Sequence, residues 1–167
     1  MAKSDSFFIR ASVNTSNGAF SQTDIDLGAY VDALGKSVLR IHNVQVQYRS
    51  ASGAATPIKS NGAGNSAEAC WQLTTQSSNA IRYADDRSVI SSGMCEAAEQ
   101  TTGQATFEAS DINLQEWTNG YLIGVESIHL GGQQSGLVDD SYISIVMECT
   151  VETLSQAAAM ALSLSQQ

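Results

Sequence analysis

The sequence predicts a single all-β domain, and three observations support this class. Eight short segments alternate apolar with polar residues at the period of two typical of a half-buried strand. Intervals rich in Gly, Ser, Asn and Asp separate these segments, as turns do. No long helical segment interrupts the strands, which argues against alternating βαβ units. A chain of 167 residues then leaves an antiparallel β-sandwich, a barrel or a jelly roll as the economical architectures.

The first two strands are expected close to the N-terminus. Every second residue is apolar in Phe7–Val13, and Ser21–Leu27 shows a weaker form of the same alternation. A short helical turn is expected after them, over Tyr30–Leu34.

The third strand, Val38–Arg49, contains a change of phase. Leu39 and Ile41 lie at odd positions, whereas Val44 and the apolar residues after it lie at even ones. A side-chain period of two cannot bury both groups on one face unless an extra residue separates them. We therefore expect a β-bulge or a sharp bend near His42–Asn43.

The middle of the chain has weaker patterns. Three strands are expected over Ala69–Thr75, Arg87–Met94 and Ala105–Ala109. A second helical turn is expected over Asp111–Trp117, capped by Ser110 or by Asp111 itself.

Two strands complete the expected eight. Gly120–Leu130 is expected to form one continuous strand. Tyr142–Glu152 has the clearest pattern, because apolar residues occupy every second position from Ile143 to Val151.

The last fifteen residues, Thr153–Gln167, carry no charge. Five of their apolar residues recur at the spacing of one helix face, and Thr153 or Ser155 can cap such a helix. The five are Leu154, Ala157, Ala158, Ala161 and Leu162. An isolated helix of this length is marginal in water, so it needs a surface to dock on. We expect residues 1–152 to form the β domain and residues 153–167 to form a helical tail, docked on its own domain or on a neighbouring copy.

The charge balance argues against a nucleic-acid partner. Seventeen acids face eight bases, which gives a net charge of −9 and an isoelectric point near 4.4. Such a field repels phosphate. The N-terminal residues do not resemble an export signal, and no apolar run is long enough to cross a bilayer. We therefore expect synthesis in the cytoplasm and no transmembrane segment.

No sequence motif of catalysis, cofactor binding or structural metal is present, so we expect neither an enzyme nor a bound cofactor. Cys70, Cys95 and Cys149 have no paired spacing and are expected to be reduced, small hydrophobic residues. His42 and His129 have no recognisable nucleophile or orienting partner.

Two alternatives remain for a ligand. Acidic loops can bind Ca²⁺, and the candidate ligands are Asp85, Asp86, Asp139 and Asp140. Aromatic side chains can stack on sugars, and Trp117 beside Thr118–Gly120 is the more exposable of the two tryptophans.

Eight strands, a corner-turning bulge, long Gly/Ser/Ala loops and a strong final strand resemble the single jelly-roll capsid proteins of icosahedral viruses. The resemblance spans Phe7–Glu152. Within this family, the chain is most similar in kind to the small capsid proteins of archaeal or bacterial viruses that contain a membrane. It carries over no functional residues. It implies an eight-stranded antiparallel jelly roll in a virion, which forms a homo-oligomer and contacts other virion proteins.

One feature departs from capsid proteins that bind RNA. Many such proteins carry a basic N-terminal arm, whereas this chain has only Lys3 and Arg10 there. The resemblance therefore implies a shell apposed to an internal membrane or a protein layer, without direct nucleic-acid contact. The competing expectations are a ligand-binding β-sandwich, for carbohydrate or Ca²⁺, and a subunit of a non-viral filament.

Overall fold

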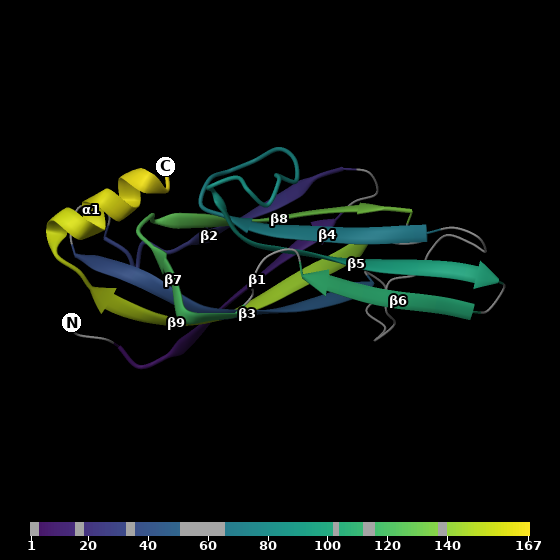
Figure 1. Ribbon diagram of the computed structural model, residues 1–167, viewed down its shortest axis with the longest axis horizontal. Coiled ribbons are helices and arrows are strands. Elements are labelled where there is room, and N and C mark those ends of the chain that lie inside the picture. Colours follow the sequence, from purple (N-terminus) through teal and green to yellow (C-terminus); the bar gives the residue numbers. More distant parts are fainter. Residues whose placement is uncertain are drawn as a thin grey trace.

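The structure is a computed structural model that describes residues 4–15, 19–32, 36–50, 66–101, 104–111, 116–136 and 140–167. Within these residues it contains nine strands and one helix (Figure 1). The strands are β1 (Phe7–Thr15), β2 (Ser21–Asp26), β3 (Ser37–Ser50), β4 (Ser66–Thr74), β5 (Val89–Thr101), β6 (Gln104–Asp111), β7 (Glu116–Ile123), β8 (Ser127–Ser135) and β9 (Ser141–Thr153). The helix is α1 (Gln156–Ser165).

The strands form two antiparallel sheets that pack face to face. One sheet has the order β1-β9-β3-β7 and the other has the order β2-β8-β4-β5-β6. Without β6, the first strand pairs with the last, the second with the second last, and so on inward to the β4–β5 hairpin. This nested pairing is the jelly-roll topology, with β6 added at one edge. The jelly-roll β-sandwich with a short C-terminal helix is therefore confirmed.

The core lies between the two sheets and is made of alternate residues from both. Its largest fully buried side chains are Trp71, Leu27, Leu39, Ile41, Leu73, Ile123, Ile128, Leu130, Ile143, Ile145 and Met147. A buried polar contact joins the sheets at one end, where the Thr15 hydroxyl donates to Gln134 Oε1 (2.6 Å). The same oxygen accepts the backbone N–H of Ser141 (2.7 Å). One buried side-chain oxygen thus satisfies two buried donors at this end of the sandwich.

The predicted bulge in the third strand is confirmed. The register of β3 against both β7 and β9 shifts between Ile41 and Asn43. His42 is the extra residue, so Ile41 and Val44 both face the core. Of the bulge and the sharp bend that the parity conflict allowed, β3 adopts the bulge.

The prediction of one strand over Gly120–Leu130 is wrong. The structure has two strands there, β7 and β8, in different sheets. The chain leaves the first sheet after Ile123 and enters the second at Ser127. Apolar residues change parity across this break, because Ile123 is buried at an odd position and Ile128 at an even one. This second change of phase marks the point where the chain crosses from one sheet to the other, not a bulge. The predicted single strand is therefore two, which brings the eight expected strands to nine.

The two predicted helical turns have different outcomes. Near the first, the N–H groups of Tyr30 and Val31 both donate to Leu27 O, so a single turn forms slightly earlier than expected. Residues 33–35 lie outside the described part of the chain. In the second, Asp111 ends β6 and Glu116 begins β7, which contradicts a helix at both ends of the segment. Residues 112–115 are also outside the described part.

Candidate functional site

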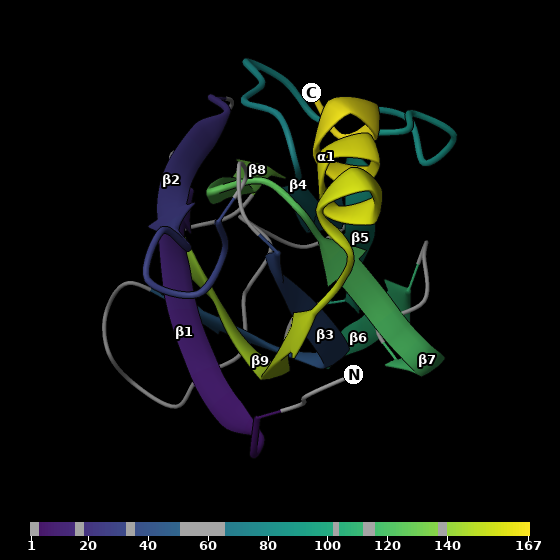
Figure 2. The ribbon, with the colours of Figure 1, turned by 90° about the vertical axis from the view of Figure 1, so that its left-hand side faces the viewer.

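Helix α1 lies at one end of the sandwich (Figure 2). Ser155 precedes it with extended backbone angles, and its hydroxyl accepts the Ala158 N–H (3.3 Å). This is a standard N-cap, which satisfies one of the helix's free donors. The predicted helical tail and the Ser155 cap are confirmed.

The face of α1 that contacts the sandwich is small and polar. Its buried residues are Ala159, Ser163 and, just after the last turn, Gln166. The Gln166 side-chain amide accepts the Gly124 N–H (2.8 Å) and donates to Leu122 O (2.8 Å). Both backbone groups lie at the end of β7, an edge strand of its sheet. The Gln166 amide therefore takes the place of a neighbouring strand at this edge.

Gly124 permits this close approach. A Cβ atom at this position would lie 3.0 Å from both Leu162 Cγ and Ser163 N. A larger residue would force the helix away from the end of β7. The absence of a side chain here sets how deeply α1 can sit.

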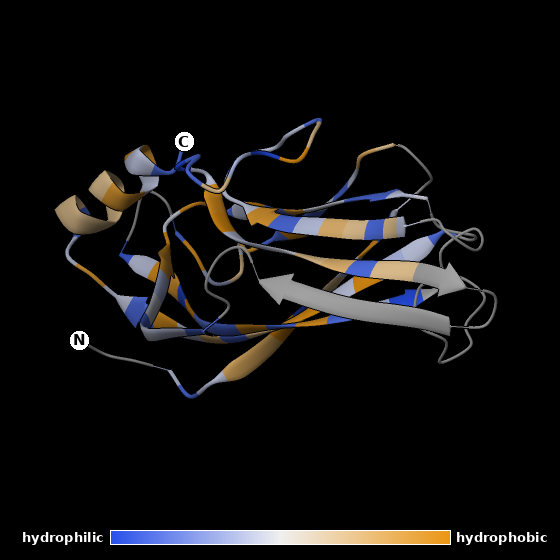
Figure 3. Ribbon diagram, turned by 45° about the vertical axis from the view of Figure 1, so that its right-hand side comes forward, coloured by the Kyte–Doolittle hydropathy of each residue, from blue (hydrophilic) through white to orange (hydrophobic). Residues whose placement is uncertain are grey.

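The opposite face of α1 is apolar and exposed. Ala157, Met160, Ala161 and Leu164 recur at i, i+3, i+4 and i+7, and we call this set the outward stripe. Met160 is 41% exposed and Leu164 is 69% exposed. Figure 3 shows the apolar colouring of this helix at the end of the molecule. Two of the larger apolar side chains of α1, Met160 and Leu164, thus point away from the domain that carries it, whereas Leu162 lies against Gly124.

The five residues expected at an interface divide into two groups. Ala157, Ala158 and Ala161 are exposed, whereas Leu154 and Leu162 are half-buried. The sequence did not single out Met160 and Leu164, the two largest side chains of the outward stripe. Their spacing from Ala157 and Ala161 was visible in the sequence. The direction in which the helix docks was not.

A buried ion pair anchors the strand that leads into α1. Arg40 on β3 donates through Nε to Glu152 Oε1 (2.8 Å) and through Nη2 to Glu152 Oε2 (2.7 Å). The Arg40 guanidinium also donates to Asn119 O. The Glu152 side chain is only 8% exposed, and its hydrogen bonds raise the pKa of Arg40. The pair holds the end of β9 against β3, three residues before the helix cap.

A depression of about 440 Å³ lies beside the bulge of β3. His42 on the bulge shares a hydrogen bond with the Thr150 hydroxyl through Nε2 (3.0 Å). The neighbouring Asn43 amide donates to Glu148 Oε2 (2.7 Å). Trp117 forms part of the wall and is half-buried, so it combines core packing with a partly accessible ring.

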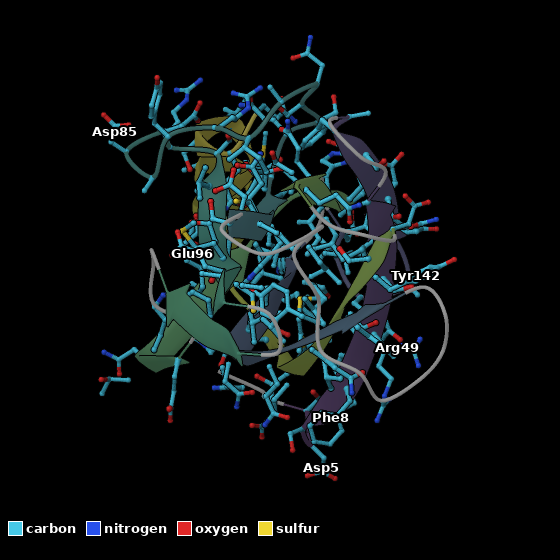
Figure 4. The ribbon with its side chains drawn as sticks, turned by 90° about the vertical axis from the view of Figure 1, so that its right-hand side faces the viewer. Asp5, Phe8, Arg49, Asp85, Glu96 and Tyr142 are labelled. Carbon is cyan, nitrogen blue, oxygen red and sulfur yellow. The ribbon has the colours of Figure 1, made fainter. Side chains whose placement is uncertain are left out.

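The acidic loop residues do not form one group. Asp86 precedes β5, where its carboxylate accepts from the N–H and hydroxyl of Ser88 and from Arg82. The Ser88 backbone and side-chain hydrogen bonds, aided by Arg82, lower the pKa of Asp86 to about 2. Asp85 projects into solvent (Figure 4). By strand register, Asp140 lies at the opposite end of the sandwich, and Asp139 is outside the described residues.

The cysteines and histidines are also separated. Cys95 and Cys149 are buried, Cys70 is half-buried, and all three are unpaired. Desolvation raises the pKa of Cys70 to about 11 and that of Cys149 to about 12, so both are poor nucleophiles. His42 lies in one sheet and His129 lies in the other. The Nδ1 atom of His129 is 2.7 Å from Asp24 Oδ1. Within the described residues, no three potential metal ligands gather.

No helix in the described part of the chain has the length and apolarity needed to cross a membrane.

Comparisons with known proteins assign no family to this chain. No protein-family model matches the chain, and no curated protein matches it. Among solved structures, it is similar to a chain of Desmodium yellow mottle tymovirus (TM-score 0.38, 8% identity), covering 90% of this chain and 89% of that one. It is also similar to VP1 of Trichodysplasia spinulosa-associated polyomavirus (TM-score 0.36, 7% identity; 88% and 96% covered). A third likeness covers 86% of this chain but only 13% of dimeric latent PorU from Porphyromonas gingivalis (TM-score 0.38, 10% identity). At such identities these likenesses assign no activity.

Proposed function

We propose that this chain is a virion structural protein, a jelly-roll subunit that self-assembles into an icosahedral shell. The observation that carries the proposal is the outward stripe of α1. A contiguous apolar face rimmed by polar residues marks a surface that another molecule covers. Jelly rolls serve as capsid and lectin domains among others, so the fold alone does not choose between these roles.

The charge distribution supports assembly without nucleic acid. A net charge of −9 disfavours contact with a genome, so the proposed shell would be apposed to an internal membrane or to another protein layer. Copies of the chain and other virion proteins are the proposed partners.

Light scattering of the purified full chain tests self-assembly. We expect particles much larger than the 17.6 kDa monomer, and we expect the fraction of protein in them to increase with protein concentration. Because the subunits carry like charge, added salt should favour assembly by screening their repulsion. A monomer that persists at high concentration and high salt would contradict the proposal.

A ligand-binding module is the second candidate, and the depression beside Trp117 favours it. An indole ring beside carboxylate, amide and hydroxyl groups is a common arrangement for stacking and hydrogen bonding a sugar. If the depression binds a glycan, a Trp117→Ala variant should lose binding by roughly tenfold or more, and Tyr83→Ala, at an exposed aromatic in another loop, should keep it. A glycan array with no signal for the native chain would remove this candidate.

A further inference from the structure

We propose that the outward stripe of α1 docks against the outward stripe of a second copy of this chain. This inference rests on the proposed function and names the partner of the surface that carries it. The contact would relate two copies by a twofold axis, since the same patch serves both sides.

The orientation of α1 prevents its own domain from covering the stripe. Turning Met160 and Leu164 inward would require the helix to rotate by about half a turn. That rotation would break both hydrogen bonds of the Gln166 amide and bring larger side chains against Gly124. The described structure therefore holds the stripe outward as long as Gln166 stays bound.

Charge favours a second copy as the occupant. Residues 153–167 form the longest run of the sequence without a charged residue. Two copies that each carry −9 repel one another over most of their surfaces, and they repel least where both surfaces are uncharged. A basic partner would gain nothing from this face, because the stripe offers no carboxylate to pair with.

The shape of the stripe suits helix-to-helix contact. Ala157 and Ala161 lie one turn apart and allow the backbones of two helices to approach closely. Met160 and Leu164 flank them and can fill the space on either side. Since Met160 is 41% exposed and Leu164 is 69% exposed in the monomer, docking would bury further apolar surface on both side chains.

The area of the stripe contact indicates that it works together with other contacts, as it would within a shell. A ten-residue helix is about 15 Å long and about 10 Å wide, so its face covers on the order of 150 Å². A stable two-body interface buries roughly 800 Å² on each partner. The stripe contact is therefore weak alone and becomes effective when each subunit makes several contacts at once.

Two charge-adding variants of the full chain test the inference. Leu164→Glu places a charge inside the stripe, and we expect the concentration needed for assembly to rise by roughly tenfold or more. Ala158→Glu adds the same charge on the same helix beside the stripe. Glu at this position also completes an S-x-x-E capping box with Ser155, so the helix should remain folded and assembly should stay close to native. Sedimentation velocity measures assembly, and thermal melting monitored by circular dichroism verifies the fold of each variant.

Cross-linking gives a second readout that does not depend on a complete shell. An Ala161→Cys variant should form disulfide-linked dimers under mild oxidation. The native chain, whose Cys95 and Cys149 are buried and whose Cys70 is half-buried, should form few. Dimers without larger particles would support the stripe contact and contradict the shell. Large particles that tolerate Leu164→Glu and yield no Ala161→Cys dimers would support the shell and overturn the stripe contact. Vesicle binding that Leu164→Glu abolishes, with self-association unchanged, would assign the stripe to a membrane and also overturn it.

Discussion

An Arg40→Met variant is expected to lose about 2–4 kcal/mol of unfolding free energy. The change leaves the Glu152 carboxylate nearly buried without its two guanidinium hydrogen bonds, and breaking a buried pair from one side is strongly destabilising. The expected loss of unfolding free energy is slightly smaller than for a fully buried pair, because the Arg40 side chain is 18% exposed. Urea unfolding followed by tryptophan fluorescence measures the loss.

Two controls isolate the cause. Arg49→Met makes the same substitution at an exposed site near the other end of β3, where the side chain projects outward (Figure 4), and should change stability by less than about 0.5 kcal/mol. The double variant Arg40→Met/Glu152→Met should recover much of the lost stability, because it also removes the carboxylate that has lost its guanidinium partner. Equal losses in the single and double variants would show that packing of the Arg40 stem, and not the ion pair, stabilises this site.

Gln166→Ala is expected to release α1 from the end of β7. It removes both hydrogen bonds that hold Leu122 O and the Gly124 N–H, each worth about 1–3 kcal/mol when its partner is left buried. The remaining inward contacts of α1, made by Ala159, Ser163 and the half-buried Leu162, do not replace these two hydrogen bonds. Hydrogen exchange at the Gly124 amide should quicken by roughly tenfold or more, while exchange in the centre of β3 should not change.

Gln167→Ala is the matched control, because it truncates the adjacent, exposed glutamine. It should leave the Gly124 exchange rate as in the native chain. Unchanged protection of Gly124 in Gln166→Ala would contradict the role assigned to this amide. Released helices would also present their stripes in many orientations, so Gln166→Ala should weaken assembly.

The fold class was readable from the sequence because strand patterning is local. In β3 the two parities of apolar residues indicated a bulge or a sharp bend, and the structure has a bulge between Ile41 and Asn43. A similar change of parity between Ile123 and Ile128 was missed, because a bulge and a crossover look alike along the chain. Only the pairing of β7 with β3 and of β8 with β4 separates them.

The site was less predictable for a different reason. The helix period correctly indicated α1 and its Ser155 cap, but it did not reveal which face would turn inward. That choice depends on Gln166 meeting two backbone groups more than forty residues away in the chain. A polar residue that fixes a helix through distant backbone partners leaves no periodic pattern in the sequence. Apolar periodicity alone therefore predicted interface residues that only partly coincide with the outward stripe.

Electron microscopy of the purified full chain at high protein and salt concentration tests the central claim most directly. The proposed function predicts closed, roughly spherical shells of uniform diameter. Open filaments or dispersed monomers under these conditions would contradict a shell-forming subunit.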